Sequence, residues 1–363
     1  MDDLCQKVWN GERITEAEAV ELAQLPLQQL GVLSDRRRQL AKADDYDGQG
    51  NGIVTYILDR NINYTNVCNV YCKFCAFWRT EKQEGAYVIS HDEIDKKIEE
   101  TVALGGTQIL MQGGHHPKLN KQWYLDLLGH IRDKFPEINI HAFSPSEFIH
   151  FRDVFDEPLE SLVRDFRDAG LGSIPGGGGE ILVDEVRNRI APLKAMTDDW
   201  LQVMAIAHNL NMASTATMMF GHVESIEHRI EHLERVRRQQ DETGGFTAFI
   251  AWTFQSENTK LRAPTVGANE YLRTQALSRI YLDNVSNIQS SWVTQGLEIG
   301  QVALNYGAND LGSIMIEENV VSEAGTTFCM DEGDMRRLIE DIGYKAHQRD
   351  NWYRLVNSRA VAA

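Results

Sequence analysis

Short apolar segments alternate with longer amphipathic segments through the middle of the chain. An extended stretch from Ile53 to Val67 comes first, and seven shorter strand-like segments follow it. Most of them are separated by segments with helical periodicity, such as the one in which Ile94, Ile98 and Val102 share a face. The seven predicted strands lie near residues 108–112, 138–142, 172–174, 213–219, 246–251, 288–290 and 311–316.

This alternation predicts an α/β fold, a parallel (β/α)8 barrel of the TIM type, with an open doubly wound sheet as the alternative. Polar or glycine-rich segments follow successive predicted strands. The carboxyl ends of barrel strands form one face, and that face carries the chemistry of such folds. These segments would lie together at one end of a barrel, and this arrangement favours the barrel over the open sheet. The segments are 68–75, 113–117, 144–147, 176–180, 221–224 and 252–255.

Two further regions flank the predicted barrel. The run Thr15-Glu16-Ala17-Glu18 has the form of a capping box, and the polar, glycine-rich run 42–52 is typical of a linker. Near the other end, Met335, Leu338 and Ile342 have helical spacing. We expect an N-terminal helical extension at 1–50, the barrel at 51–328 and a C-terminal helical segment at 329–363.

Composition narrows the possible partners. The 363 residues are 42% hydrophobic, enough for a large core, and the net charge is −17. Nucleic acids and anionic membranes bind basic surfaces, so neither is an expected partner. The start Met1-Asp2-Asp3 shows no signal peptide, and no apolar run has the length of a membrane span. We expect a cytoplasmic protein.

Three of the five cysteines form a cluster with the spacing Cys68-x3-Cys72-x2-Cys75. An odd number of cysteines fits a disulfide framework poorly. Structural zinc sites and ferredoxin clusters both need four ligands. Three thiolates on a four-iron cluster leave one iron open to a small molecule, and S-adenosylmethionine fits that vacancy. A zinc ion completed by His91 or His115 is the alternative.

The spacing, with Phe74 before the last cysteine, resembles the radical S-adenosylmethionine (radical SAM) superfamily. From about residue 53 to residue 330 the chain is similar to the futalosine and deazaflavin branch of that superfamily. Two segments narrow the resemblance to the dehypoxanthine futalosine cyclase family of menaquinone biosynthesis, although Ala251 stands where that family has Pro. The segments that carry the branch resemblance are 59–68, 72–77, 111–114, 175–178 and 307–310, and the two narrower ones are 217–224 and 249–255.

The resemblance implies a 4Fe–4S cluster held by Cys68, Cys72 and Cys75, with S-adenosyl-L-methionine as the second cofactor. It implies a small-molecule substrate, dehypoxanthine futalosine, whose ribose C4′ hydrogen is removed by a 5′-deoxyadenosyl radical before a carbon–carbon ring closure. It also implies a one-electron reductant such as flavodoxin or ferredoxin. The alternatives are an aminofutalosine synthase, which adds the adenosyl radical to an enolpyruvyl benzoate, and a non-catalytic binding protein stabilised by zinc or a cluster.

Four residues are predicted to bind the cofactor. By resemblance, Gly113 and Gly114 present backbone carbonyls to the methionine ammonium group, although both glycines are also typical of a tight turn. Glu180 follows the run Gly176 to Gly179 and is a candidate partner for ribose hydroxyls, with a structural role as the alternative. Ser144 completes the set.

Six residues are predicted to take part in catalysis or substrate binding. His222 and Glu224 are the catalytic candidates, although a histidine there can also orient its loop. Trp252 and Phe254 can stack on an aromatic ring or close the barrel mouth. Gln255 and Asn309 are further candidates for substrate binding. Three histidines, His115, His116 and His141, are expected at the surface or against the substrate rather than on a metal ion.

Overall fold

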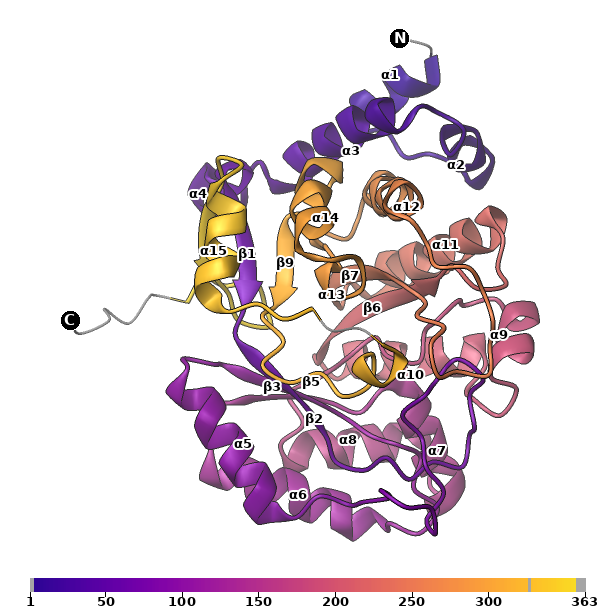
Figure 1. Cartoon of the computed structure of the whole chain (residues 1–363), viewed down its shortest axis with the longest axis vertical. Coiled ribbons are helices and arrows are strands. Elements are labelled where there is room, and N and C mark those ends of the chain that lie inside the picture. The colour runs from indigo at the N-terminus through magenta and orange to yellow at the C-terminus, as the bar shows by residue number, and fades with distance from the viewer. Residues whose placement is uncertain (1–2, 326–327, 357–363) are drawn as a thin grey trace, which may run out of the picture.

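The structure is a computed structural model, and it describes residues 3–325 and 328–356. The molecule consists of one parallel β-sheet surrounded by helices (Figure 1). The order of the strands is β10-β1-β9-β8-β7-β6-β5-β4-β3-β2, and all of these neighbours are parallel. The strands are β1 (Ile53–Ile57), β2 (Asp59–Asn63), β3 (Gln108–Gln112), β4 (Asn139–Ala142), β5 (Ser173–Ile174), β6 (Ala213–Phe220), β7 (Phe246–Thr253), β8 (Ile288–Gln289), β9 (Asp310–Ser313) and β10 (Lys345–Gln348).

The two ends of the sheet are joined by a single stretch of chain. Only Leu58 separates β1 from β2, yet β1 pairs with β9 and β2 pairs with β3. The Leu58 carbonyl accepts a hydrogen bond from the Thr107 amide (3.2 Å), at the point where the pairing changes sides. Because β1 and β2 act as one strand, the sheet curls into a barrel with β3 to β9 as the other members. The predicted parallel barrel is confirmed.

Strand β10 lies beside β1, outside that set, and no apolar pattern predicted it. Its sequence, Lys345-Ala346-His347-Gln348, is mostly polar, and only Ala346 is buried. Backbone pairing with β1 (Ile53 opposite Lys345) therefore makes this strand, rather than an apolar face. Figure 1 shows the yellow C-terminal segment against the indigo start of the barrel.

Helices cover the outside of the barrel, mostly at the positions that the periodicity predicts. The helices that were not predicted include α7, which begins directly after β4, the short α9, and α4, which lies in the run 42–52 that was expected to be a linker. Helix α7 has Ser144 as its N-cap, a reciprocal hydrogen-bonded capping box with Glu147, and Pro145 in the first turn. The α-helices are α1 (Asp3–Trp9), α2 (Glu16–Leu22), α3 (Leu27–Lys42), α4 (Asp45–Gly48), α5 (His91–Ala103), α6 (Lys121–Lys134), α7 (Pro145–Phe155), α8 (Leu159–Ala169), α9 (Asp184–Ile190), α10 (Thr197–Asn209), α11 (Ile226–Thr243), α12 (Ala268–Tyr281), α13 (Trp292–Gln295), α14 (Leu297–Val302) and α15 (Glu332–Glu340).

The N-terminal helices pack on the outer surface of α11 and α12. Arg13 pairs with Asp241 (2.6 Å) and Asp283 (2.9 Å), and Arg273 donates hydrogen bonds to two backbone carbonyls that follow α2. Lys42, at the end of α3, is buried and donates to the side-chain oxygen of Asn287. These contacts hold the first helices against the barrel. Among the described residues, no helix combines the length and apolarity needed to cross a membrane.

Two buried histidines behind the barrel wall make the fold sensitive to acid. His208 hydrogen-bonds through its two ring nitrogens to Thr243 and Ser214 (2.6 Å each), and burial lowers its pKa to about 4. His232 accepts a hydrogen bond from the Leu182 amide, and burial lowers its pKa to about 3. Both rings are therefore neutral in the folded protein at pH values where an unfolded histidine is protonated.

We expect the free energy of unfolding to decrease as the pH falls from about 6.5, the ordinary histidine pKa, toward 4. In this pH range the histidine is protonated in the unfolded chain but not in the folded chain. Each such histidine therefore changes the free energy of unfolding by about 1.4 kcal/mol per pH unit. The variant His208→Gln should have a shallower slope than the wild type in urea unfolding measured across this pH range. Equal slopes would show that His208 does not titrate in this way.

Candidate active site

The three clustered cysteines lie in the long loop between β2 and α5, at the mouth of the barrel. Backbone hydrogen bonds tie this loop down: Cys68 donates to the Arg79 carbonyl (3.0 Å), Cys75 to the Cys72 carbonyl (3.3 Å) and Lys73 to the Ile190 carbonyl (2.9 Å). The Cys72 side chain is buried, and those of Cys68 and Cys75 are partly exposed. The loop therefore holds three thiols at one edge of the barrel.

The donor set fits an iron–sulfur cluster. Burial raises the pKa of the Cys72 thiol to about 12 and also raises that of Cys75, and a bound cationic metal centre would favour the thiolate form of both. In the described part of the chain, no three Cys, His, Asp or Glu side chains come close enough together to share one metal ion. A zinc ion needs that convergence, whereas each thiolate of a four-iron cluster binds a different iron.

The histidines proposed as a fourth zinc ligand have other neighbours. His91 stacks on His130 with ring centroids 4.5 Å apart. His115 packs against His150 at 5.0 Å, and burial lowers its pKa well below the ordinary value. His116 accepts hydrogen bonds through Nδ1 from two backbone amides of its own loop. His115 and His116 thus shape the loop behind the cysteines.

Gly113 and Gly114 bring the end of β3 against the cysteine loop. The Gly114 amide donates to the Thr65 carbonyl (2.8 Å), and a Cβ atom on Gly114 would overlap the Val67 carbonyl. A Cβ atom on Gly113 would overlap the Tyr64 ring. Both positions therefore need glycine, because two backbone segments approach closely here. The predicted contact of their carbonyls with a methionine ammonium group stays a prediction.

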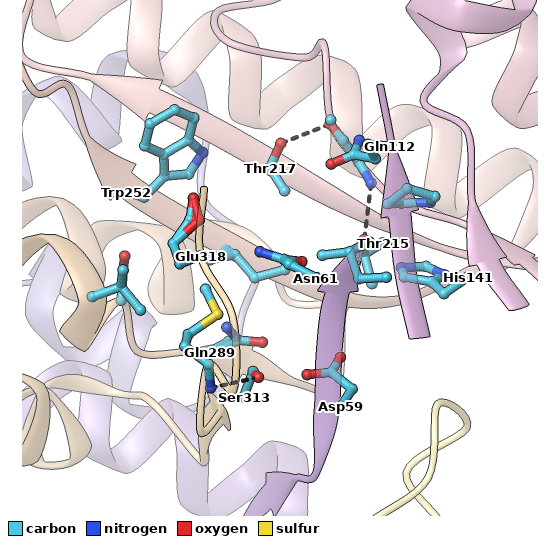
Figure 2. Close-up of a pocket in the computed structure, with 18 of the residues that line it drawn as sticks. Asp59, Asn61, Gln112, His141, Thr215, Thr217, Trp252, Gln289, Ser313 and Glu318 are labelled. Atoms are coloured by element: carbon cyan, nitrogen blue, oxygen red, sulfur yellow. Dashed lines mark hydrogen bonds between the residues drawn. The ribbon is translucent and has the colours of Figure 1, made fainter. Parts of the chain in front are cut away.

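A cavity of about 300 Å³ occupies the barrel interior (Figure 2). Inward-facing polar side chains from successive strands line it. Those labelled in Figure 2 on the strands are Asp59 and Asn61 of β2, Gln112 of β3, His141 of β4, Thr215 and Thr217 of β6, Gln289 of β8 and Ser313 of β9.

Sequence reasoning missed most of these lining residues, although a signal for them exists. Asp59, Asn61 and Asn63 occupy alternate positions of β2, with Arg60 and the buried Ile62 between them, and Thr215 and Thr217 repeat the spacing on β6. Alternate residues of a strand share one face, so these side chains point to one side of the sheet. Burying polar groups in a barrel costs free energy unless they have partners, so such a pattern indicates a binding cavity.

The glycine-rich segment after β5 connects this cavity with the cysteine loop. Gly176, Gly177 and Gly178 line the cavity, and Glu180 does so as well. Glu180 accepts a hydrogen bond from Lys194 (2.8 Å), whose positive charge also lowers the pKa of Cys72 against the larger effect of burial. The Glu180–Lys194 pair is therefore placed between the cavity and the thiols.

Of the predicted substrate-binding residues, Trp252 lines the cavity and three do not. Phe254 is buried beside the His222 ring, and Gln255 donates hydrogen bonds to Thr253. The Asn309 side chain lies within the barrel wall. Its oxygen accepts hydrogen bonds from Arg279 (2.6 Å) and from the Ile288 amide. Substrate contact by these three residues stays a prediction.

The predicted catalytic pair is engaged within its own loop after β6. His222 meets the Met219 carbonyl through Nε2 (3.1 Å) and accepts from the Val223 amide through Nδ1 (2.7 Å). Glu224 accepts from two loop amides and pairs with Arg229 (2.7 Å). Neither residue lines the cavity. Ser144, predicted to bind cofactor, likewise caps α7 and bonds to Glu147. Their predicted roles stay untested, and the geometry favours the loop-orienting alternative.

Three residues from the end of the chain reach the cavity, and sequence reasoning named none of them. Arg349 follows β10 and pairs through two nitrogens with Asp310 (2.6 and 2.9 Å). Asn351 and Glu318 also line the cavity. None of these residues belongs to a local motif, so only the folded barrel brings them to the site.

Comparisons with known proteins agree with this geometry. The sequence profile of the Radical SAM superfamily matches residues 62–236, and that of the CofH/MqnC C-terminal region matches residues 243–361. The cyclic dehypoxanthine futalosine synthase of Halalkalibacterium halodurans is 42% identical over 99% of this chain and 95% of its own. The cyclic dehypoxanthine futalosine synthase of Streptomyces coelicolor is 44% identical over 94% of this chain and 86% of its own.

Among solved structures, methylornithine synthase (PylB) superposes with a TM-score of 0.72 at 17% identity, covering 95% of this chain and 97% of the other. That likeness concerns the fold. The barrel and the three-cysteine loop define a radical SAM enzyme. Within that superfamily, the chain belongs to the family that includes the two cyclic dehypoxanthine futalosine synthases.

We expect Cys72→Ala to abolish assembly of the iron–sulfur cluster and cleavage of S-adenosylmethionine. The protein supplies only three thiolate ligands, so this substitution leaves one iron of the cluster without its protein ligand. The measurements are anaerobic iron and sulfide analysis, the absorption spectrum and 5′-deoxyadenosine release after reconstitution. Cys329→Ala changes an exposed thiol outside the cluster and is the matched control. Full iron content and activity in Cys72→Ala would exclude this site.

Proposed function

We propose that the protein is a radical SAM cyclase that converts dehypoxanthine futalosine into cyclic dehypoxanthine futalosine in menaquinone biosynthesis. The observation that carries the proposal is the 42–44% identity to two synthases of that name, over nearly the whole chain. The cavity inside the barrel, which Glu180 and the glycines before it help to line, supports the proposal, because a radical reaction needs a site shielded from water.

Cys68, Cys72 and Cys75 would hold a 4Fe–4S cluster, and Glu180 with the glycines before it would receive the adenosyl part of S-adenosylmethionine. When bound, these cofactors supply a 5′-deoxyadenosyl radical. Gly176, Gly177 and Gly178 line the cavity, and the lack of a Cβ atom lets this backbone pack closely against Thr215, Gln112 and Ser146. The Glu180 carboxylate, fixed by Lys194, is suited to accept hydrogen bonds from ribose hydroxyls.

The rest of the cavity would orient the substrate, which combines a ribose, a short keto chain and a benzoate ring. Asn61, Gln112 and Thr217 offer amide and hydroxyl groups to the ribose and the keto oxygen. Trp252 offers a ring face to the benzoate. Holding the ring near C4′ favours ring closure over side reactions, because orientation in a closed site replaces a chance encounter.

We also propose a one-electron reductant of the flavodoxin or ferredoxin type as a partner. Lys73 in the cysteine loop and Lys260 in the segment after β7 are both exposed. The two segments are neighbours, because the Lys260 amide donates a hydrogen bond to the Lys73 carbonyl (2.9 Å). In a chain with a net charge of −17, local positive charge at this position is suited to an acidic electron carrier.

We expect substrate deuterated at C4′ to pass its deuterium into free 5′-deoxyadenosine, together with a cyclised product two hydrogens lighter than the unlabelled substrate. Abstraction requires the radical carbon close to van der Waals contact with the C4′ hydrogen, and misplacement loses most of the advantage of proximity. Mass spectrometry of both products makes the measurement. Unlabelled 5′-deoxyadenosine would contradict the proposal, and an adenosyl adduct would instead indicate an aminofutalosine synthase.

A further inference from the structure

Glu318 lines the cavity, and its carboxyl group lacks a complete set of hydrogen-bond partners. One oxygen, Oε1, accepts hydrogen bonds from the amides of Val320 (2.9 Å) and Val321 (2.7 Å). The other, Oε2, is buried and makes no hydrogen bond of normal length and angle among the described residues, although the Asn61 amide lies near enough to the carboxyl to lower its pKa. An ionised oxygen in such a place retains free lone pairs, and no cationic side chain of the described residues pairs with it.

The neighbours of Glu318 keep its charge uncompensated. Burial raises its pKa, the adjacent charge of Glu317 raises it further, and the Asn61 amide lowers it by less than burial raises it. Glu317 itself is neutralised by Lys97 (2.6 Å) and Arg60 (2.7 Å). In the described ranges, no Lys, Arg or His forms an ion pair with Glu318. A carboxylate held in this way has an increased affinity for a proton.

The other titratable side chains that line the cavity are engaged in ion pairs or hydrogen bonds. Glu180 is paired with Lys194, and Arg349 with Asp310. His141 bonds to Ser173, and burial lowers its pKa to about 3. Asp59 accepts a hydrogen bond from Gln108 (3.0 Å) and stands two residues before Asn61 on β2. Glu318 is thus the lining carboxylate that retains an oxygen without a partner.

Trp252 and Asn61 enter the cavity where Glu318 does. Figure 2 draws the Glu318 carboxyl between the Trp252 ring and the Asn61 amide in this view, and all three line the cavity. A benzoate ring that stacks on Trp252 would bring its ring hydrogens toward the unpartnered oxygen. A general base must lie within hydrogen-bond reach of the proton it removes.

We propose that Glu318 is the catalytic base that removes the ring proton after the carbon–carbon bond has formed. This inference rests on the proposed function. In the step, the C–H bond at the newly substituted ring carbon breaks, its electron pair returns to the ring and the proton forms an O–H bond with Oε2. The one surplus electron leaves the ring for a one-electron acceptor of the iron–sulfur or flavin class, and the aromatic ring is restored.

The first test compares the wild type with Glu318→Gln and Glu317→Gln in the reconstituted enzyme. We expect Glu318→Gln to form cyclised product roughly 10²–10⁴-fold more slowly, the usual value of base catalysis, while it still releases 5′-deoxyadenosine labelled from C4′-deuterated substrate. The ratio of 5′-deoxyadenosine to product should rise far above that of the wild type. Glu317→Gln, which alters the neighbouring carboxylate outside the cavity, should keep the wild-type ratio.

Deuterium on the benzoate ring distinguishes a base from a residue that only shapes the site. If Glu318 removes the proton, ring deuteration should slow product formation in Glu318→Gln by a primary isotope effect that the wild type does not show. Glu318→Asp keeps a carboxylate one methylene shorter and should recover part of the lost rate. Product formation within about threefold of the wild type, or equal loss of 5′-deoxyadenosine and product, would overturn the assignment.

A third measurement needs no cofactor. Because the folded protein raises the pKa of this carboxyl, its ionised form opposes folding, and the stability it contributes when protonated is lost as the pH rises. Glu318→Gln should therefore gain thermal stability relative to the wild type at about pH 8, and gain less at about pH 5. Absence of that difference would show that Glu318 is compensated and is not the base. Failure of label transfer in the wild type would instead overturn the proposed function.

Discussion

The structure depends on one stretch of backbone, residues 53–63, that hydrogen-bonds to both ends of the sheet. Its first half pairs with β9 and β10, and its second half pairs with β3. Buried backbone groups must be hydrogen-bonded, so this stretch satisfies two sheet edges that would otherwise be open. The closure creates an interior that side chains do not completely fill. Because the cysteine loop begins directly after Asn63, the same stretch places the thiols at the mouth of that interior.

Charge inside the barrel is arranged in compensated pairs. Arg349 with Asp310, and Lys194 with Glu180, each place a cation on a carboxylate within 2.8 Å at the cavity wall. A buried ion pair contributes little to stability against an apolar alternative, but removal of one partner leaves a charge that is costly to bury. These pairs therefore fix the positions of the wall residues. Two lining carboxyl groups have no such cation: Asp59 accepts a hydrogen bond from the neutral Gln108 side chain, and Glu318 retains an oxygen for which we propose a chemical role.

The loops at the barrel mouth also determine which polar residues reach a ligand. His222 and Glu224 look catalytic in the sequence, yet their hydrogen bonds close the loop after β6 around Gly221. Ser144 and Glu147 do the same at the start of α7 and additionally anchor the Gly113 amide. Such residues act on the site through the backbone that they hold.

The sequence by itself determined most of the barrel strands and the cluster of three cysteines. Alternating apolar segments predicted the parallel barrel, and the spacing of Cys68, Cys72 and Cys75 predicted three thiols on one loop, because both signals are local. Trp252 and Glu180, predicted to bind substrate and cofactor, both line the cavity, and those two roles stay predictions. Strand alternation at Asp59 and Asn61 could have extended that list.

Only the tertiary structure decided which of the remaining residues face the cavity. Glu318, Arg349 and Asn351 lie far along the chain from the cysteines, in segments without apolar periodicity. Backbone pairing between β10 and β1, and the course of the chain after β9, bring them to the barrel interior. The orientation of a side chain in a loop is set by the contacts that the whole fold supplies, and residue type and local spacing do not contain that information.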